Sequence, residues 1–287
     1  MSFNINIITW NINGIRSRIF NSRVSTKLKK NEILIPEKES SIDNLINETQ
    51  PDIICFQETR CEKDYGENFI KIDGYNNFFN SSKLDNHRSG SRYSGTAILT
   101  KIKPNNVLYN VPEYNDLEGR IIIAEYDNFT LINVYSPNSG TNYDNKISFQ
   151  NALLNFINSL NTSIIYCGDF NMAIETHFDI SKSKPMPGIY QHELDYYKNL
   201  INNNFIDIKS KNDKIIFTWW DQRSKKVINE ETNKETNLMR YKNKGWRIDY
   251  IFIKGFLTGE SFVLKHIGEE YSPHASDHAP LLGKLCL

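Results

Sequence analysis

The sequence lacks several features that would assign it to a broad class of protein. It has four cysteines in 287 residues, at positions 55, 61, 167 and 286, and they form neither a Cys-x-x-Cys pair nor a zinc-site spacing. No apolar run approaches the roughly 18 residues that a transmembrane helix needs. The N-terminus has neither the basic region nor the apolar region of a signal peptide. We therefore expect a soluble, intracellular protein whose thiols are reduced and mostly structural.

Neither the charge balance nor the glycine spacing points to a ligand. Lys and Arg together number 34, as do Asp and Glu, so any attraction to a polyanion must come from the local arrangement of basic residues. No glycine-rich segment has the Walker or Rossmann spacing, which excludes those nucleotide-binding loops. Hydrophobic residues make up 39% of the chain and aromatic residues 12%, which is ordinary for a globular enzyme and excludes a disordered chain.

Apolar runs and amphipathic segments follow one another along the chain and predict one domain, residues 1–287, with two sheets and a few helices. We expect strands at residues 5–10, 53–56, 75–80, 96–100, 121–126, 129–134, 164–167, 215–220, 250–253 and 281–285. Helices are expected from Ser41, over residues 146–160 with Asp144 or Asn145 as the cap, and over residues 193–203. Residues 21–40 and 224–244 are polar and charged, and we expect them to be surface insertions.

Polar side chains follow several of the apolar strands. Asp169 and Asn171 stand two positions apart after one strand, and residues at that spacing in an extended chain point to the same side. Asn11 and Asn13 follow the first strand in the same way, and Glu58 follows the second. Each has an ordinary explanation by itself, because asparagines form Asx turns and carboxylates are common in loops. Together, at the strand ends where layered α/β folds hold ligands, they favour a site for a hard cation such as Mg²⁺.

The segment Ser276-Asp277-His278-Ala279-Pro280 places an acid beside an imidazole just before the last strand. Asp249 begins a strand that could neighbour this one, and a carboxylate bonded to one ring nitrogen would fix the tautomer and raise the proton affinity of the imidazole. Such a pair suits a site that faces an anionic oxygen. No Ser or Cys nucleophile stands among these groups, so they indicate metal-assisted hydrolysis of a phosphate ester.

Eight short motifs occur in order along nearly the whole chain: Trp10-Asn11-Ile12-Asn13-Gly14-Ile15-Arg16, Cys55-Phe56-Gln57-Glu58-Thr59, Tyr93-Ser94-Gly95-Thr96-Ala97, Glu118-Gly119-Arg120, Tyr135-Ser136-Pro137-Asn138, Gly168-Asp169-Phe170-Asn171, Gly245-Trp246-Arg247-Ile248-Asp249 and Ser276-Asp277-His278-Ala279-Pro280. Jointly they are highly specific. In these motifs the chain resembles the exonuclease III family of apurinic/apyrimidinic (AP) endonucleases, which lies in the endonuclease/exonuclease/phosphatase superfamily.

The resemblance implies a fold and a metal site. The fold would be an α/β four-layer sandwich, with two mixed β-sheets face to face, flanked by helices, and the site at one edge. The metal would be Mg²⁺, with Mn²⁺ able to substitute, held mainly by Glu58 with Asn11, Asn13 and Asp277 nearby. Family members carry either Asp or Asn at position 13, so the asparagine of this chain means that a second metal carboxylate is missing there.

The resemblance also implies the catalytic roles. Asp169 would orient or deprotonate the attacking water. Asp249 would orient His278, and phosphate oxygens would be held by Asn138, Asn171 and His278. Tyr135 would contact the phosphate, and both a phenol and a phenolate fit that role.

Double-stranded DNA containing abasic sites is the expected partner of a monomeric protein that does not bind membranes. By resemblance, Trp219, Trp246 and Ile248 wall a pocket that accepts a bare deoxyribose and excludes a base. Arg92 and Tyr93, from a polar loop that could touch phosphates or simply be solvated, are assigned to the same DNA-contacting region. Basic residues flank the tryptophan segment and would contact backbone phosphates: Arg223, Lys225, Lys226, Lys242, Lys244 and Arg247.

The expected activity is that of a Mg²⁺-dependent AP endonuclease of base excision DNA repair, cutting 5′ to an abasic site. A 3′-5′ exonuclease and a 3′-phosphodiesterase activity would accompany it. The alternative enzyme is a phosphatase or phosphodiesterase that acts on lipid or small-molecule phosphate esters, which Trp219 and Trp246 disfavour. A catalytically dead binding module would require the loss of a core group, yet Glu58, Asp169 and His278 are all present.

Overall fold

The computed structural model describes residues 4–20, 33–84, 89–140, 142–209, 216–231, 233–256, 258–268 and 276–287. Most of the surface insertion that we predict at 21–40 lies outside these residues. Within the described residues, no helix combines the length and the apolar character needed to cross a membrane. All four cysteines are free thiols, and three of them are buried.

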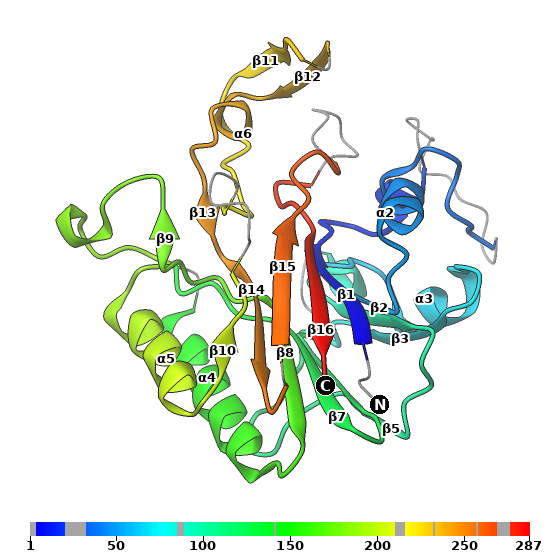
Figure 1. Ribbon diagram of the computed structural model, residues 1–287, viewed down its shortest axis with the longest axis vertical. Helices are drawn as coiled ribbons and strands as arrows, with labels where there is room; N and C mark the ends of the chain where they lie inside the picture. Colours follow the sequence, from blue (N-terminus) through cyan, green and yellow to red (C-terminus); the bar gives the residue numbers. More distant parts are fainter. Residues whose placement is uncertain are drawn as a thin grey trace.

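Two six-stranded sheets form the centre of the molecule (Figure 1). The first sheet has the order β15 (Thr258–Val263), β16 (Leu281–Cys286), β1 (Asn4–Asn11), β2 (Ile53–Gln57), β4 (Thr96–Thr100) and β3 (Asn76–Asn80). The second has the order β10 (Ile206–Asp207), β14 (Asp249–Lys254), β8 (Ser163–Asp169), β7 (Phe129–Tyr135), β6 (Ile121–Glu125) and β5 (Asn106–Leu108). Each sheet is mixed, because β1 runs parallel to β2 and β7 runs parallel to β8, while the other pairs are antiparallel.

Alternation along the strands explains why the sheets and helices stack in layers. In β1, Ile5 and Ile7 pack between the two sheets, whereas Ile8 and Trp10 point to the outer face. That outer face packs against α2 (Ser41–Thr49), while the outer face of the second sheet packs against α4 (Tyr143–Ser159) and α5 (Gln191–Asn202). Three separate apolar clusters therefore fill the spaces between four layers, and the predicted four-layer sandwich is confirmed.

Shorter elements complete the chain: α1 (Arg16–Ile19), α3 (Lys63–Phe69), η1 (Gly90–Arg92), β9 (Glu175–Thr176), η2 (Ile180–Lys182) and β13 (Trp246–Arg247). The cap of α4 differs from our prediction. The helix begins earlier, and the side chain of Asn142, rather than Asp144 or Asn145, accepts a hydrogen bond from the backbone N–H of Asn145 at 3.1 Å. Polar residues in the first turn hid this start, because the periodic apolar pattern begins only later.

The strand that we predict at 215–220 is wrong for its described part, residues 216–220. Trp219 makes only isolated bridges, to Trp246 and His278, and no ladder continues through Trp220. The backbone N–H groups of the two tryptophans go to different segments, since Trp219 donates to the carbonyl of Trp246 and Trp220 to that of Asp277. An apolar run of strand length can thus be a connection that is buried between other elements.

Within the predicted insertion at 224–244 lie a hairpin, β11 (Lys226–Asn229) and β12 (Lys234–Asn237), and the helix α6 (Leu238–Tyr241). The hairpin projects from the top of the molecule in Figure 1. Its base is anchored, because buried Arg240 donates hydrogen bonds to the carbonyls of Ile267, Gly268 and Ser276. This polar segment is therefore fastened to the loop that carries His278.

Gly168 sets how closely β7 and β8 approach each other. Its φ is +141°, and a Cβ placed on it would lie 1.9 Å from the carbonyl oxygen of Val134. No side chain fits there without separating two central strands directly beside Asp169.

Gly168→Ala should therefore destabilise the protein by at least about 3 kcal/mol, since a backbone clash adds to an unfavourable positive φ. Thermal or urea denaturation would measure this loss. Gly74→Ala is the matched control, because Gly74 also has a positive φ of +77° but a Cβ placed on it would meet nothing within 4 Å. That control should cost only about 1–2 kcal/mol. Equal losses for the two variants would contradict the clash.

Candidate active site

The strand ends of the two sheets meet at one edge of the sandwich. Asn11 ends β1 and Glu58 follows β2 in the first sheet, while Tyr135 ends β7 and Asp169 ends β8 in the second. The amide of Asn11 donates hydrogen bonds to Asp169 Oδ2 at 2.9 Å and to Glu58 Oε1 at 3.1 Å. The hydroxyl of Tyr135 donates to Glu58 Oε1 at 2.6 Å. Side chains from four strands, predicted separately from the sequence, therefore form one hydrogen-bonded group.

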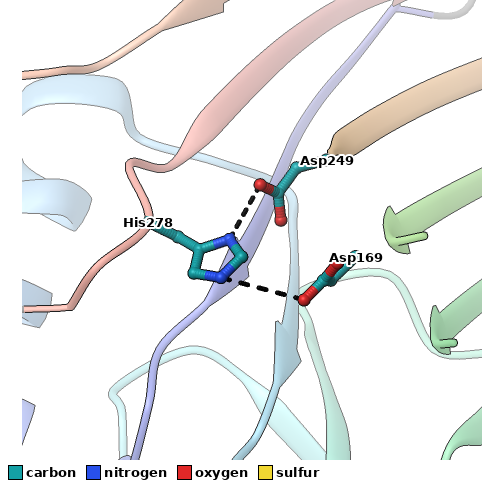
Figure 2. Close-up of side chains that lie close together, drawn as sticks. All are labelled: Asp169, Asp249 and His278. Carbon is teal, nitrogen blue, oxygen red and sulfur yellow. Dashed lines mark hydrogen bonds and ion pairs between the residues drawn. The ribbon is translucent and has the colours of Figure 1, made fainter. Parts of the chain in front are cut away.

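His278 lies between two carboxylates of the opposite sheet (Figure 2). Its Nδ1 is 2.9 Å from Asp249 Oδ2 and its Nε2 is 3.8 Å from Asp169 Oδ2. The expected partnership of Asp249 with His278 is present in the structure, but their strands are not neighbours within one sheet. Asp249 begins β14 of the second sheet, whereas His278 precedes β16 of the first, so the pair bridges the two sheets.

Burial and mutual charge set the protonation of this trio. Burial on its own would lower the pKa of His278, but Asp249, Asp169 and Asp277 raise it to about 10. Burial raises the pKa of Asp169, and the negative charge of Asp249 raises it further. The positive charge of His278 lowers it in part, so that the pKa of Asp169 is about 7. At neutral pH the imidazole is therefore a cation, and Asp169 is poised to exchange a proton.

Glu58 is the carboxylate best placed to bind a cation. Burial would raise its pKa, but the Arg60 guanidinium 2.7 Å away and the hydrogen bonds from Tyr135 and Asn11 lower it below the ordinary value. An ionised carboxylate is the ligand type that a hard divalent cation prefers. The ligand atoms of Asp169, Asp249 and His278 also lie within 4.8 Å of one another, but a protonated imidazole cannot ligate a cation, so only the two carboxylates of this trio could do so at neutral pH. Asp249 Oδ1 is buried and has no hydrogen-bond partner among the described residues, which leaves one acceptor unused there.

The other predicted metal ligands are engaged in hydrogen bonds. Asn11 turns its amide nitrogen, not its oxygen, towards both carboxylates, and its Oδ1 accepts from the backbone N–H of Asn13 at 3.2 Å. Asp277 accepts from Asn13 Nδ2 and from Trp219 Nε1, each at 3.1 Å. Because an N–H group cannot ligate a cation, Asn11 would have to rotate its amide to do so.

Asn138 and Asn171 lie together at the rim of the site. Asn138 Nδ2 donates to Asn171 Oδ1 at 3.3 Å, and the backbone N–H of Asn171 donates to Asp169 Oδ1 at 2.9 Å. The backbone of Asn171, Asn13 and Glu58 is left-handed, with φ of 46°, 50° and 49°. Asparagine tolerates this conformation but glutamate does so at a cost, so the surrounding fold holds Glu58 in place.

The three residues predicted to wall a pocket belong to one small apolar cluster. Ile248 is buried, and Trp219 and Trp246 pack against it with ring centroids 5.9 Å apart and planes at 73°. Arg92 and Tyr93 are not part of this apolar cluster. Arg92 is largely exposed beside Glu62, and Tyr93 accepts a hydrogen bond from Arg120 at 3.5 Å.

Arg247 does not belong to the predicted basic surface. It is buried and donates hydrogen bonds to Asp207 at 2.7 Å and to Glu175 at 3.2 Å, so it cannot reach a phosphate outside the protein. Arg247 follows Trp246 in the sequence, but successive side chains of a strand point to opposite faces, so Arg247 points inward from β13. The other five residues of this group are exposed: Arg223, Lys225, Lys226, Lys242 and Lys244. Arg223 and Lys226 are paired with Asp221 and Glu235.

The site is supported by three cations that we did not predict as part of it. Arg60 pairs with Glu58. Arg120 donates to the carbonyl of Tyr135 at 3.0 Å and lies 4.5 Å from its ring centroid. Lys146 is fully buried on α4 and donates to the carbonyl of Phe170 at 2.5 Å, beneath the turn after Asp169. A signal for Lys146 existed in the sequence, since it shares a helical face with Phe149 and Leu153 at the i+3 and i+7 positions.

Comparison with known proteins identifies this arrangement. A model of the Endonuclease/Exonuclease/phosphatase family matches residues 8–278. The chain belongs to this family. The resemblance inferred from the eight motifs is thereby confirmed.

Curated relatives are similar over nearly the whole chain. Recombination repair protein 1 of Drosophila melanogaster is 29% identical over 97% of this chain, which spans only 37% of that longer protein. The Exodeoxyribonuclease of Bacillus subtilis is 28% identical over 96% of this chain and 97% of its own length. The DNA-(apurinic or apyrimidinic site) endonuclease of Dictyostelium discoideum is 27% identical over 96% of this chain and 69% of its own.

Among solved structures, a 3′-5′ exonuclease from Neisseria meningitidis superposes with a TM-score of 0.74 at 21% identity, covering 98% of this chain and 99% of that one. This match shows that the two chains share a fold.

The pKa of about 10 for His278 can be measured directly by NMR of its ring nitrogens. The ring should stay protonated at pH 8 and titrate near pH 10, whereas in Asp249→Asn it should lose its proton at a much lower pH, because burial then dominates. Since the pKa rises on folding from 6.5, the stabilisation from the protonated imidazole is fully present below pH 6.5 and is lost as the pH rises towards 10. A wild-type ring that titrates near pH 6.5 would contradict this assignment.

Proposed function

We propose that this protein is a Mg²⁺-dependent AP endonuclease of base excision DNA repair that hydrolyses the phosphodiester 5′ to an abasic site. A 3′-5′ exonuclease and a 3′-phosphodiesterase activity would accompany it. The names of the relatives from Bacillus subtilis and Dictyostelium discoideum support DNA hydrolysis. The observation that carries the proposal is the trio Asp169, His278 and Asp249, facing Glu58 across the sheet edge, beside an exposed rim of amides and an aromatic cluster.

Asp169 and His278 divide the work of proton transfer and charge stabilisation. Asp169, whose pKa is raised to about 7, orients the attacking water and accepts its proton. The water oxygen forms the new bond to phosphorus and the bond from phosphorus to the 3′ oxygen breaks. The departing 3′ oxygen takes a proton from solvent, which leaves a 3′-hydroxyl and a 5′-deoxyribose phosphate. The His278 cation, fixed by Asp249, lies where it can donate to a phosphate oxygen as negative charge builds up.

Glu58 would hold the divalent cation, which when bound stabilises negative charge on the phosphate as a Lewis acid. Tyr135 donates a hydrogen bond to Glu58, and burial together with the negative charge of Glu58 keeps the pKa of the phenol well above its ordinary value. Tyr135 therefore contacts the phosphate as a neutral phenol. The amides of Asn138 and Asn171 donate to Asn171 Oδ1 and to the carbonyl of Ser136, and would turn at the rim towards the remaining phosphate oxygens.

The aromatic cluster supports an abasic sugar as the substrate group. Trp219 connects this cluster to the reacting groups, because its indole N–H donates to Asp277, the residue before His278. An apolar wall of Trp219, Trp246 and Ile248 would accept a deoxyribose without a base, whose extrusion costs less unstacking energy than that of an intact nucleotide. The exposed lysines at 225, 242 and 244 would contact the DNA backbone.

A duplex with one tetrahydrofuran lesion tests the proposal. The protein should incise it 5′ to the lesion with Mg²⁺ and not with a chelator, because the charge on the phosphate is then left without its Lewis acid. An undamaged duplex of the same sequence is the control for specificity. The absence of metal-dependent incision, or faster hydrolysis of a soluble inositol phosphate than of the lesion duplex, would refute the proposal in favour of the alternative enzyme.

Asp169→Asn should lower the rate of incision by roughly three or more orders of magnitude, because it removes the general base and part of the site's electrostatics. Binding to the lesion duplex, measured by fluorescence anisotropy in chelator, should remain. Exposed Asp127→Asn, in the turn before β7 and so at the opposite end of that strand from Tyr135, is the control and should leave the rate unchanged. Near-normal activity of Asp169→Asn would show that the water is activated elsewhere.

A further inference from the structure

Three polar side chains lie close together in the largely apolar space between the two sheets. Thr9 on β1, Gln57 on β2 and Asn133 on β7 are each 0% exposed. Their surroundings are the aliphatic residues and thiols of the cluster between the sheets. Polar groups in such a layer cost free energy unless every one of them finds a partner, so their presence calls for an explanation.

Hydrogen bonds from these residues cross from one sheet to the other. Gln57 Nε2 donates to Asn133 Oδ1 at 2.7 Å and to Thr9 Oγ1 at 3.0 Å. Asn133 Nδ2 donates back across the gap to the carbonyls of Ala97 at 2.9 Å and Phe56 at 3.2 Å. Asn133, a residue of the second sheet, thus binds two strands of the first.

The network is not fully satisfied. Gln57 Oε1 is buried and has no hydrogen-bond partner among the described residues. An unpaired buried acceptor is a net cost, and an apolar pair of similar volume would avoid it. Stability alone therefore does not account for these side chains.

The position of the three residues along their strands supplies the reason. Thr9 is two residues before Asn11, Asn133 is two residues before Tyr135, and Gln57 directly precedes Glu58. Residues two apart in a strand share a face, so Thr9 and Asn133 lie directly beneath Asn11 and Tyr135. The hydrogen bonds that cross the site, from Tyr135 to Glu58 and from Asn11 to Asp169, lie one step above this network.

We infer that the Thr9–Gln57–Asn133 network is a positioning device that fixes how the two sheet edges face each other, and so holds Glu58 against Tyr135 and Asp169. Apolar layers permit small relative shifts, since methyl groups have no directional contacts, whereas hydrogen bonds of this geometry are satisfied at one relative placement. The inference rests on the proposed hydrolytic function only for its kinetic readout. A misplacement of about 1 Å can lower a rate by about a hundredfold.

The test is a double-mutant cycle with Gln57→Met, Asn133→Leu and the two combined. Each single change should destabilise the protein, because it leaves a buried polar group unpaired, and the combination should restore much of the lost stability. The combined variant should nevertheless have a kcat about ten- to a hundredfold below the wild type, with KM for the lesion duplex changed by less than about threefold.

Tyr126→Phe is the matched control. Its hydroxyl donates to Thr100 Oγ1 at 3.3 Å, and this hydrogen bond also joins the two sheets, away from the strand ends that carry the site. This variant should lose stability without a change in kcat. Isosteric Thr9→Val, which removes only the hydroxyl that accepts from Gln57, should fold even if the combined variant does not, and its kcat should fall by at least about threefold.

A combined variant with wild-type kcat, or a Thr9→Val variant with wild-type kcat if the former does not fold, would overturn the inference. A Tyr126→Phe variant whose kcat falls as much as that of the combined variant would also overturn it, because any hydrogen bond between the sheets would then have the same effect.

A crystal structure of the combined variant gives a readout that needs no activity. The separation of Tyr135 Oη from Glu58 Oε1 should exceed the 2.6 Å of the wild type, and an unchanged separation counts against the network even if the wild type proves inactive on DNA.

Discussion

The hydrogen bond between His278 and Asp249 is the contact on which the site depends, because its two ends come from different sheets. Asp249 and Asp169 begin and end neighbouring antiparallel strands and face each other in register, so their separation is fixed by the second sheet alone. His278 enters from the first sheet and places a cation between them. Without that cation two buried carboxylates would repel each other, and one of them would take up a proton instead.

Buried charge is the second constraint on this arrangement. Each carboxylate of the site lies near a cation or an N–H donor: Glu58 beside Arg60, Asp169 beside His278 and the amide of Asn11, and Asp277 beside the indole of Trp219. Pairing of this kind offsets a desolvation cost that no single hydrogen bond would cover. The same pairing places side by side two groups that differ in proton affinity: the His278 imidazole, which keeps its proton, and the Asp169 carboxyl, whose pKa lies near neutrality. Acid–base chemistry at neutral pH requires such a pair.

The site also depends on supports that lie outside it. Lys146 on α4 holds the turn that follows Asp169, and Arg120 lies under the ring of Tyr135. Arg240, from the polar segment that carries the hairpin, binds the carbonyl of Ser276 at 3.1 Å and so fixes the loop before His278. These three cations come from different parts of the fold, and each binds a backbone carbonyl at or near a residue that would contact a phosphate.

The sequence by itself determined most of the central strands and the polar groups at their ends, because alternation and strand termination depend on neighbours only a few positions apart. It did not indicate the edge strands β5, β10 and β15. The order of the motifs likewise indicated the family, the four layers, and Glu58, Asp169 and His278 as one group. Only the tertiary structure decided which sheet each strand joins, that Arg247 points inward to Asp207, that Asn11 offers its amide nitrogen, and that residues 216–220 form no strand. These outcomes depend on contacts between residues far apart in the chain, and side-chain partners are chosen by packing and charge that no local pattern records.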